Sequence, residues 1–434
     1  MRRRTLALTL PLGLLALAAC DSDEPANPSK GTGAPSDVDV DPAPTVVEER
    51  ADTVDVTELR LPLEMTPMIV VDPGWTATPL ERDGIFLGYS DAGDRLRFRA
   101  VAQDGTLLWQ AQRPLSCTGY GLSADPDGTA IAVLADTASE GGAPLATSLT
   151  GYDLRTAEVR WGPVEVPGPQ AAQGMVYSAT EEAPMGSSQT RTALVAGTGE
   201  IALTEEELDG GRILAEHGGV VVMIDGDELV ALEAADGEQR WRIALPEGLE
   251  PERSAIGPRI DPNTGYAVLG DGSGAGTVID LADGHVIARD ADQVAHDHVL
   301  DVTVLAAGTT VRGLDPDGSE SWRHEDAEQL RFITAGERLA YAQRQEEGTL
   351  VVLDTSHGRM VQPYDVDQTG ALAVPEIFSA DSAAAVDVDG ARYLVTTTFD
   401  EDYGTRLPAP RGVSALTGTG RSLSADRHRE ESQR

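Results

Sequence analysis

The chain has 434 residues and a formal net charge of −39, and apolar residues make up 41 % of it while aromatic residues make up only 4 %. A surface this acidic repels phosphate backbones and anionic lipid headgroups, so the composition disfavours nucleic-acid binding. The two cysteines, Cys20 and Cys117, exclude a disulfide framework and a cysteine-rich zinc or iron–sulfur site.

The first 19 residues have the order of an export signal. Three arginines, Arg2 to Arg4, precede an apolar run from Leu6 to Ala19 that is too short to span a bilayer. The end of this run, Leu-Ala-Ala-Cys at residues 17–20, resembles the bacterial lipobox, whose cysteine is lipidated and becomes the mature N-terminus. The alternative is a plain secretory signal with a chance cysteine. We expect Cys20 to carry a diacylglyceryl group that anchors the chain on the extracytoplasmic face of the cell membrane.

Residues 20–56 are predicted to form a disordered tether behind that anchor. This stretch contains ten acidic residues but only two basic residues, Lys30 and Arg50, with prolines and serines between them. So few apolar side chains cannot offset the conformational entropy lost on folding.

The stretch from Gly219 to Trp241 predicts three strands joined by two tight turns. Gly219 to Met223 is an apolar run, Glu228 to Leu232 alternates polar with apolar residues, and Glu238 to Trp241 follows. The breaks contain Asp-Gly pairs, the strongest short-range signal for a hairpin.

The end of this stretch recurs along the chain, usually as a glycine four residues before a bulky residue. Four of the five tryptophans occupy this repeat slot. The residues that define the repeat are Trp109, Trp161, Trp241, Trp322, Gly105, Gly237, Gly284, Gly318 and Gly358. A period near 40 residues with four short strands per unit predicts a single all-β propeller of seven or eight blades, with eight preferred because a degenerate unit lies around Thr192 to Leu203.

The Asp-x-x-(Thr)-Gly-x-x-x-Trp ending resembles that of the PQQ-like β-propeller repeat family. The resemblance covers roughly residues 72–400 and implies a propeller domain at 57–403, followed by a disordered C-terminal tail at 404–434. Leu59 to Val71 are expected to pair into the last blade and close the ring. The repeat is a structural motif, so it implies the fold far more than an activity.

Several possible cofactor sites have a plainer explanation. Enzymes of this fold, as the resemblance implies, hold a quinone beside a disulfide between adjacent cysteines, and this chain has no such pair. His296 and His298 resemble a metal pair but lack an identifiable third ligand, so a polar loop before a strand at Val299 to Leu305 is favoured. Four Asp-rich turns, which begin at Asp125, Asp225, Asp315 and Asp387, are typical of Asx turns and lack the spacing of a calcium loop.

Two further features of the sequence are interpreted as structural. The glycine-rich loop from Gly270 to Gly276 precedes a strand at Thr277 to Leu281, whereas a phosphate loop needs a helix there. Arg160, Arg240 and Arg323, near the repeat ends, are expected to pair with carboxylates on the blade surface.

The sequence therefore predicts an anchored propeller without a catalytic residue, metal or cofactor, which acts as a non-enzymatic binding or scaffolding module. Its expected partners are the membrane and envelope proteins, peptides or glycans, and the chain is expected to be a monomer. The alternatives are a secreted propeller enzyme, quinoprotein-like or hydrolytic, and a ligand sensor. Trp241 should be deeply buried between blades, and Trp75, outside the repeat slot, should matter less for stability.

Overall fold

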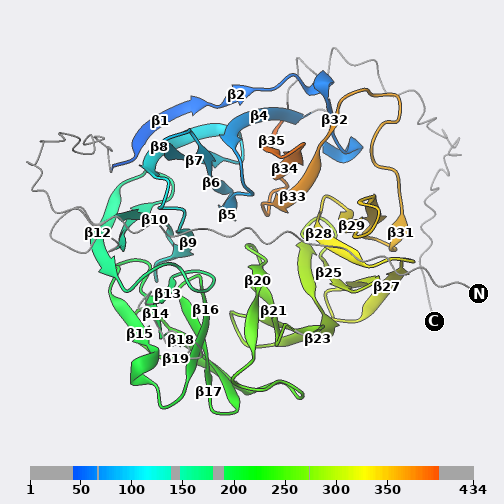
Figure 1. The fold of residues 1–434 in the computed structure, drawn as a ribbon. Coiled ribbons are helices and arrows are strands. Elements are labelled where there is room, and N and C mark those ends of the chain that lie inside the picture. The colour runs from blue at the N-terminus through cyan, green and yellow to red at the C-terminus, as the bar shows by residue number, and fades with distance from the viewer. Residues whose placement is uncertain (1–42, 66–67, 138–146, 179–189, 273, 400–434) are drawn as a thin grey trace, which may run out of the picture. The chain divides into compact units, whose positions relative to one another are not determined.

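The computed structural model describes residues 43–65, 68–137, 147–178, 190–272 and 274–399. These residues form eight blades that follow one another around a ring, which confirms the all-β propeller and the preference for eight blades over seven (Figure 1). The signal segment, Cys20 and the C-terminal tail lie outside the described residues.

The blades follow the chain order. Blade 1 contains β5 (Leu80–Arg82), β6 (Ile85–Asp91), β7 (Arg95–Ala102) and β8 (Thr106–Pro114), and blade 2 contains β9 (Tyr120–Ala124), β10 (Ala130–Thr137), β11 (Thr147–Asp153) and β12 (Val159–Val166). Blade 3 contains β13 (Val176–Ser178), β14 (Arg191–Leu194) and β15 (Ile201–Thr204), and blade 4 contains β16 (Arg212–His217), β17 (Val220–Asp225), β18 (Glu228–Glu233) and β19 (Gln239–Ala244).

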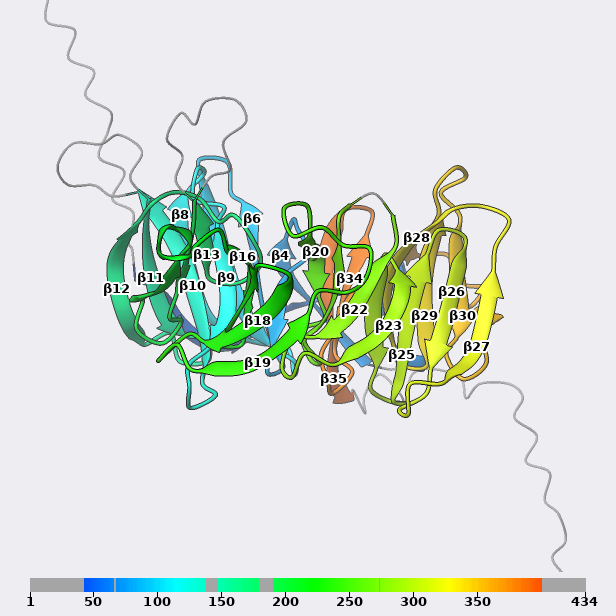
Figure 2. The same ribbon diagram turned by 90° about the horizontal axis from the view of Figure 1, so that it is seen from below.

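The second half of the ring repeats this pattern. Blade 5 contains β20 (Ala255–Ile260), β21 (Tyr266–Gly270), β22 (Gly276–Asp280) and β23 (Val286–Ala291), and blade 6 contains β24 (Gln293–Asp297), β25 (Val302–Ala307), β26 (Thr310–Leu314) and β27 (Glu320–Glu325). Blade 7 contains β28 (Leu330–Gly336), β29 (Leu339–Arg344), β30 (Leu350–Asp354) and β31 (Arg359–Met360), and blade 8 contains β33 (Val374–Phe378), β34 (Ala384–Val388), β35 (Ala391–Phe399) and β4 (Met68–Trp75). Figure 2 shows the strands of successive blades side by side along the edge of the ring.

Blade 3 is the degenerate unit that the sequence predicts near residue 200. Its innermost strand is reduced to one bridge between Gln170 and Tyr177, flanked by backbone hydrogen bonds from Ala171 to Val176 and from Ser178 to Pro169. The blade therefore keeps the four-stranded plan with only three full strands.

Burial falls from the middle of a blade to its outer strand. In blade 4, five of the six residues of β17 are buried, while β19 buries only Trp241. A strand covered on both faces needs a continuous apolar run, and an outer strand needs only one anchoring residue. This is why the sequence shows an apolar run, then an alternating run, then a charged run with one tryptophan.

The tryptophans in the repeat slot join blades 1, 2, 4 and 6 to the blades that follow them. The indole Nε1 of Trp109, Trp161, Trp241 and Trp322 donates a hydrogen bond to a backbone carbonyl of the following blade, at Leu154, Ala196, Leu281 and Thr355 respectively. The residue opposite each tryptophan on the third strand of its own blade is small, and these residues are Ala100, Gly151, Ala231 and Gly313. A small residue there leaves room for the ring to lie across the sheet.

Two of the repeat glycines lie directly under a tryptophan of the preceding blade. A Cβ added to Gly284 would lie 2.7 Å from the Trp241 ring, and one added to Gly358 would lie 2.3 Å from the Trp322 ring. Both glycines also have positive φ, +76° and +64°. Glycine is therefore required at these turns by the backbone conformation and by the close approach of the ring.

The ring closes through the N-terminal strand β4, which pairs antiparallel with β35. The sequence predicts that Leu59 to Val71 close the ring. In the structure the closing strand runs from Met68 to Trp75. Residues before it form η1 (Val56–Glu58), β3 (Leu59–Arg60) and η2 (Leu63–Met65), and β3 pairs parallel with β32 (Ala371–Leu372). A third short 3-10 helix, η3 (Glu205–Glu207), follows β15.

Trp75 corrects one expectation from the sequence. The sequence predicts that Trp75 lies outside the repeat slot and matters less for stability. Val71 does take the slot position of blade 8, over Gly105. The side chain of Trp75 is nevertheless only 1 % exposed. Its ring lies against Gly88 of blade 1, and its Nε1 donates to the Arg99 carbonyl at 3.2 Å. Trp75 thus fills the interface between blades 8 and 1, where the ring closes.

The tether expected over residues 20–56 also differs from the structure at its C-terminal end. Residues Thr45–Arg50 form β1, which pairs with β8, and Asp52–Thr53 form β2, which pairs with β4. These strands extend the outer edges of blades 1 and 8. Strand pairing satisfies their backbone groups while the charged side chains stay exposed, so a net acidic composition did not prevent order here.

The innermost strand of blade 5 reaches blades that are not its ring neighbours. The Gln173 side chain of blade 3 donates to the Pro258 carbonyl at 2.7 Å, and Arg259 donates to the Ile333 carbonyl of blade 7 at 2.5 Å. Asn263, just after β20, donates to the Phe378 carbonyl of blade 8 at 3.0 Å. We call residues 257–263 the crossbar, because they connect opposite parts of the ring.

Candidate functional site

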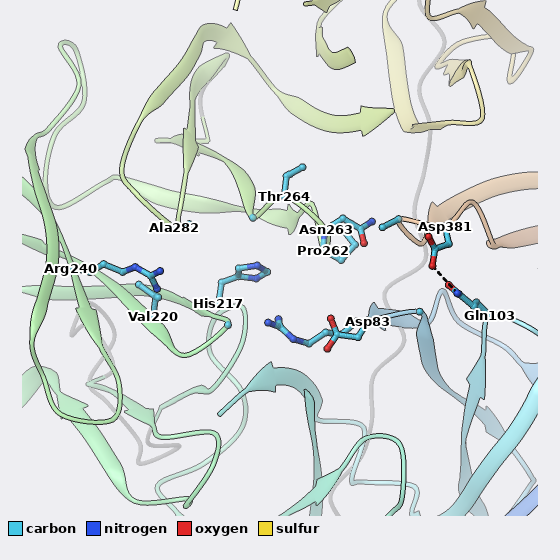
Figure 3. Close-up of a pocket in the computed structure, with 15 residues that line it drawn as sticks. Asp83, Gln103, His217, Val220, Arg240, Pro262, Asn263, Thr264, Ala282 and Asp381 are labelled. Carbon is cyan, nitrogen blue, oxygen red and sulfur yellow. Dashed lines mark hydrogen bonds between the residues drawn. The ribbon is translucent and has the colours of Figure 1, made fainter. Parts of the chain in front are cut away.

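A cavity of about 570 Å³, the outer cavity, lies between the turns that follow four innermost strands. It is lined by residues 82–84 of blade 1, 217–218 of blade 4, 262–265 of blade 5 and 380–381 of blade 8. Figure 3 shows His217, Pro262 and Asn263 on facing turns, with Asp83 beside them and the Gln103–Asp381 hydrogen bond at the far side. Turns carried by rigid strands are where propellers place binding groups.

A second cavity, the inner cavity of about 320 Å³, shares Arg82, His217 and Pro262 with the outer one. Its remaining lining includes Tyr120 and the amides of Gln170 and Gln173. The three shared residues therefore form the boundary between the two cavities.

Acidic residues at the ends of innermost strands hold the turns around these cavities. Glu81 accepts a hydrogen bond from the Gly84 N–H, and Asp261 accepts from Asn263 and Thr264. Asp297 accepts from the backbone of Val299 and Leu300. A carboxylate that accepts backbone N–H groups fixes the conformation of the turn beside it.

Glu216 is the carboxyl among these that bonds to the blades before its own, and it is 1 % exposed. It accepts from the Ser123 hydroxyl of blade 2 at 2.6 Å, from the Met175 N–H of blade 3 at 2.9 Å and from the Gly219 N–H of its own blade at 2.7 Å. It therefore joins three consecutive blades beside the inner cavity. Burial raises its pKa, and the three hydrogen bonds oppose that rise.

Burial also changes the charge of two residues at the cavity boundary. It raises the pKa of Glu81 from 4.5 to about 8, because the hydrogen bond from the Gly84 N–H and the positive charge of Arg82 offset only part of the desolvation of this carboxyl. Burial and, to a smaller extent, the nearby positive charge of Arg82 lower the pKa of His217 to about 4. At neutral pH both Glu81 and His217 are therefore uncharged.

The histidine pair singled out in the sequence does not form a metal site with a third ligand. The His296 and His298 rings lie edge to face with centroids 4.7 Å apart, and His296 contacts Thr303 and Asp301. Among the described residues, no group of three or more histidine, cysteine or acidic side chains is placed to hold a metal ion. The prediction that these histidines lie in a polar loop before a strand at Val299 to Leu305 is wrong in part. His296 and Asp297 end β24, and the next strand begins at Val302.

Two of the Asp-rich turns hold backbone N–H groups as expected. Asp125 accepts from Asp127 and Thr129, and Asp387 accepts from Gly390. The glycine-rich loop is followed by a strand, β22, as the sequence predicts.

The arginines near the repeat ends pair with carboxylates as the sequence predicts. Arg160 contacts Asp153 at 2.6 Å, Arg240 contacts Glu233 at 3.3 Å and Arg323 contacts Glu320 at 2.7 Å.

Apart from Arg240, the polar residues that line the outer and inner cavities were not singled out in the sequence. Two of them, Glu81 and Arg82, end β5, and another two, Glu216 and His217, end β16. A glycine turn follows each pair, in Leu80-Glu81-Arg82-Asp83-Gly84 and in Ala215-Glu216-His217-Gly218. This shared pattern, a polar pair at the end of an innermost strand, is the signal that could have identified them.

Cys117 is a free thiol and is 4 % exposed. Burial raises its pKa, which lowers the thiolate fraction at neutral pH. We expect slow labelling by a thiol reagent under native conditions and complete labelling under denaturing, non-reducing conditions. A change in electrophoretic mobility on reduction would contradict this expectation.

In the part of the chain that the structure describes, no helix is long and apolar enough to cross a membrane.

Comparison with known proteins gives one family and two structural likenesses. A family model described as outer membrane protein assembly factor BamB matches residues 182–401, half of the chain. No curated protein matches the chain. A crystal structure of BamB from Moraxella catarrhalis shares 15 % identity, covers 81 % of this chain and 99 % of that chain, and has a TM-score of 0.38. A chain in a crystal structure of a nidogen/laminin complex shares 12 % identity, covers 64 % of this chain and 92 % of that chain, and has a TM-score of 0.26.

Proposed function

Since the chain belongs to the family described as outer membrane protein assembly factor BamB, we propose that it is a membrane-anchored, extracytoplasmic propeller lipoprotein that acts as a non-enzymatic binding or scaffolding module. The described residues offer turns from four blades around one cavity of about 570 Å³, and this is the observation that carries the proposal. Its partners are envelope proteins, peptides or glycans, and the propeller itself is a monomer.

Site-specific crosslinking on intact cells tests the binding role. A photoreactive residue in place of Asp83 or Asp381, both exposed at the outer cavity, is expected to capture a defined partner. The control is the same residue in place of Val159, which is 58 % exposed on the outer strand of blade 2. Capture of the same species from all three positions, or from none, would remove the support for a binding face at the cavity.

The anchor is tested separately through Cys20. Two acyl chains give stable membrane attachment where one chain is marginal. Cys20→Ser is therefore expected to release the protein into the medium or to leave it unprocessed, as measured by partitioning into detergent. Detergent partitioning equal to that of the parent protein would refute lipidation at this residue.

A further inference from the structure

Arg82, the last residue of β5, is a cation in the ring interior without a bound acceptor. It lines both the outer and the inner cavity and also a third cavity of about 280 Å³ that it shares with Arg240. Its Nε is buried and has no hydrogen-bond partner, and none of the described residues accepts a hydrogen bond from its guanidinium. A guanidinium carries five N–H donors in a planar fork that matches a carboxylate. Buried donors of this kind are normally bonded.

The described acidic residues near Arg82 form no ion pair with it, although the positive charge of Arg82 acts on the buried Glu216 carboxyl. Glu81 is neutral at pH 7 because its pKa is raised to about 8, and its bonded oxygen faces the Gly84 N–H. Glu216 accepts from three other donors. Asp381 is held by the Gln103 amide at 2.9 Å. Asp83, the next residue, is exposed, and no ion pair joins it to Arg82 among the described residues. Although the chain carries a net charge of −39, the Arg82 guanidinium therefore makes no hydrogen bond or ion pair with a described carboxylate.

The outer cavity also contains a second cation. Arg240 lines it with a side chain that is 43 % exposed and that contacts Glu233 at 3.3 Å. The crossbar lies behind it, since Asn263 of the lining is bonded across the ring to the Phe378 carbonyl.

We propose that Arg82 binds the terminal carboxylate of a ligand that enters the outer cavity, with Arg240 as a second cationic contact at the rim. The ligand is a peptide with a free C-terminus or a small carboxylic acid, because both present this group at an end. The volume of about 570 Å³ lies within the range of small-ligand sites. The inference deepens the proposed binding function by naming the ligand group, and it rests on that function.

Titration of the purified protein with formate tests the site directly. The Nε–H resonance of Arg82, assigned by its loss in Arg82→Lys, is expected to shift and saturate with a dissociation constant on the order of 1–10 mM. Formamide has a similar shape and no charge, and it is expected to cause no shift. The saturable shift should persist in Arg155→Gln, which removes an exposed arginine from the turn between β11 and β12.

Arg82→Gln and Arg82→Lys measure the role of the guanidinium in formate binding. Calorimetry should show no binding to Arg82→Gln and at least fivefold weaker binding to Arg82→Lys, which keeps the charge but loses the fork. Thermal unfolding of both variants shows whether they are folded. If a folded Arg82→Gln protein binds formate as the parent does, or if the Nε–H shift does not saturate, the proposal is wrong. Tighter binding of inorganic phosphate than of formate would also overturn it.

A peptide library identifies the source of the carboxylate. Retention of free-acid peptides, but not of their C-terminally amidated forms, by the parent protein and not by Arg82→Gln would indicate a peptide C-terminus. Saturable formate binding without such discrimination would support a small carboxylic acid. The crosslinking experiment on cells does not depend on this chemistry, so a failure there and a failure here are distinguishable.

Discussion

Replacing Trp75 by alanine is expected to reduce the free energy of unfolding by about 3–5 kcal/mol. The ring is 1 % exposed, lies against Gly88 and packs in a cluster with Val71, Phe86 and Leu394. Its removal leaves a cavity and deletes the hydrogen bond to the Arg99 carbonyl at the interface where the ring closes. Chemical denaturation followed by circular dichroism measures the loss.

Trp241→Ala is the matched comparison, because Trp241 fills the interface between blades 4 and 5 and is 8 % exposed. We expect the Trp75 variant to lose at least as much stability as the Trp241 variant. Val159→Ala, on an exposed outer strand, is the control and should change the free energy of unfolding by less than about 0.5 kcal/mol. A Trp75→Ala loss close to that control would contradict the buried role of Trp75 in ring closure.

Glu81→Gln is expected to change how stability depends on pH. The folded pKa of Glu81 is about 8 against 4.5 for a solvated carboxyl, so between these values the folded protein keeps a proton that the unfolded chain has lost. The Glu81 contribution therefore favours unfolding increasingly as pH rises from about 4.5 to about 8 and is constant above that. Each pH unit in this window is worth at most about 1.4 kcal/mol.

Glutamine has the shape of the protonated carboxyl and can still accept from the Gly84 N–H. The variant should match the parent protein within about 1 kcal/mol at pH 5 and should be more stable by about 2–4 kcal/mol at pH 8.5. Urea unfolding at both pH values measures this difference. Glu238→Gln, at an exposed turn, is the control and should leave the pH dependence unchanged. If the pH dependence of Glu81→Gln is parallel to that of the parent, Glu81 is ionised in the folded state.

The repeat in the sequence was sufficient to predict the propeller and to favour eight blades over seven, because four of the blades place a tryptophan in the same slot of a recurring hairpin. Trp75 could not be assessed in this way. Its strand belongs to a blade whose other strands lie some 300 residues later, and a bulge at Asp72 to Gly74 shifts it relative to the repeat. Only the pairing of β4 with β35 shows that its ring meets blade 1.

The cavity residues were harder to predict for a related reason. Arg82 and His217 are 135 positions apart in the sequence and meet only because the ring brings turns of blades 1 and 4 together. The loss of solvent that keeps Glu81 protonated depends on the crossbar and the neighbouring turns, which no local pattern contains. By contrast, the Asp-rich turns were interpreted correctly at Asp125 and Asp387, because an Asx turn depends on residues within four positions.

The outer position of β1 has a mechanical consequence. A force applied to the chain before residue 45 reaches the propeller first at the Thr45–Gln110 pair, at one end of β1. Antiparallel pairs loaded from one end separate one after another, so β1 and then β2 would peel from blades 1 and 8 before the load reaches β4. The nine residues from Thr45 to Thr53 would add about 30 Å of extended chain. Under tension the protein would thus lengthen at its edge while the ring stays closed.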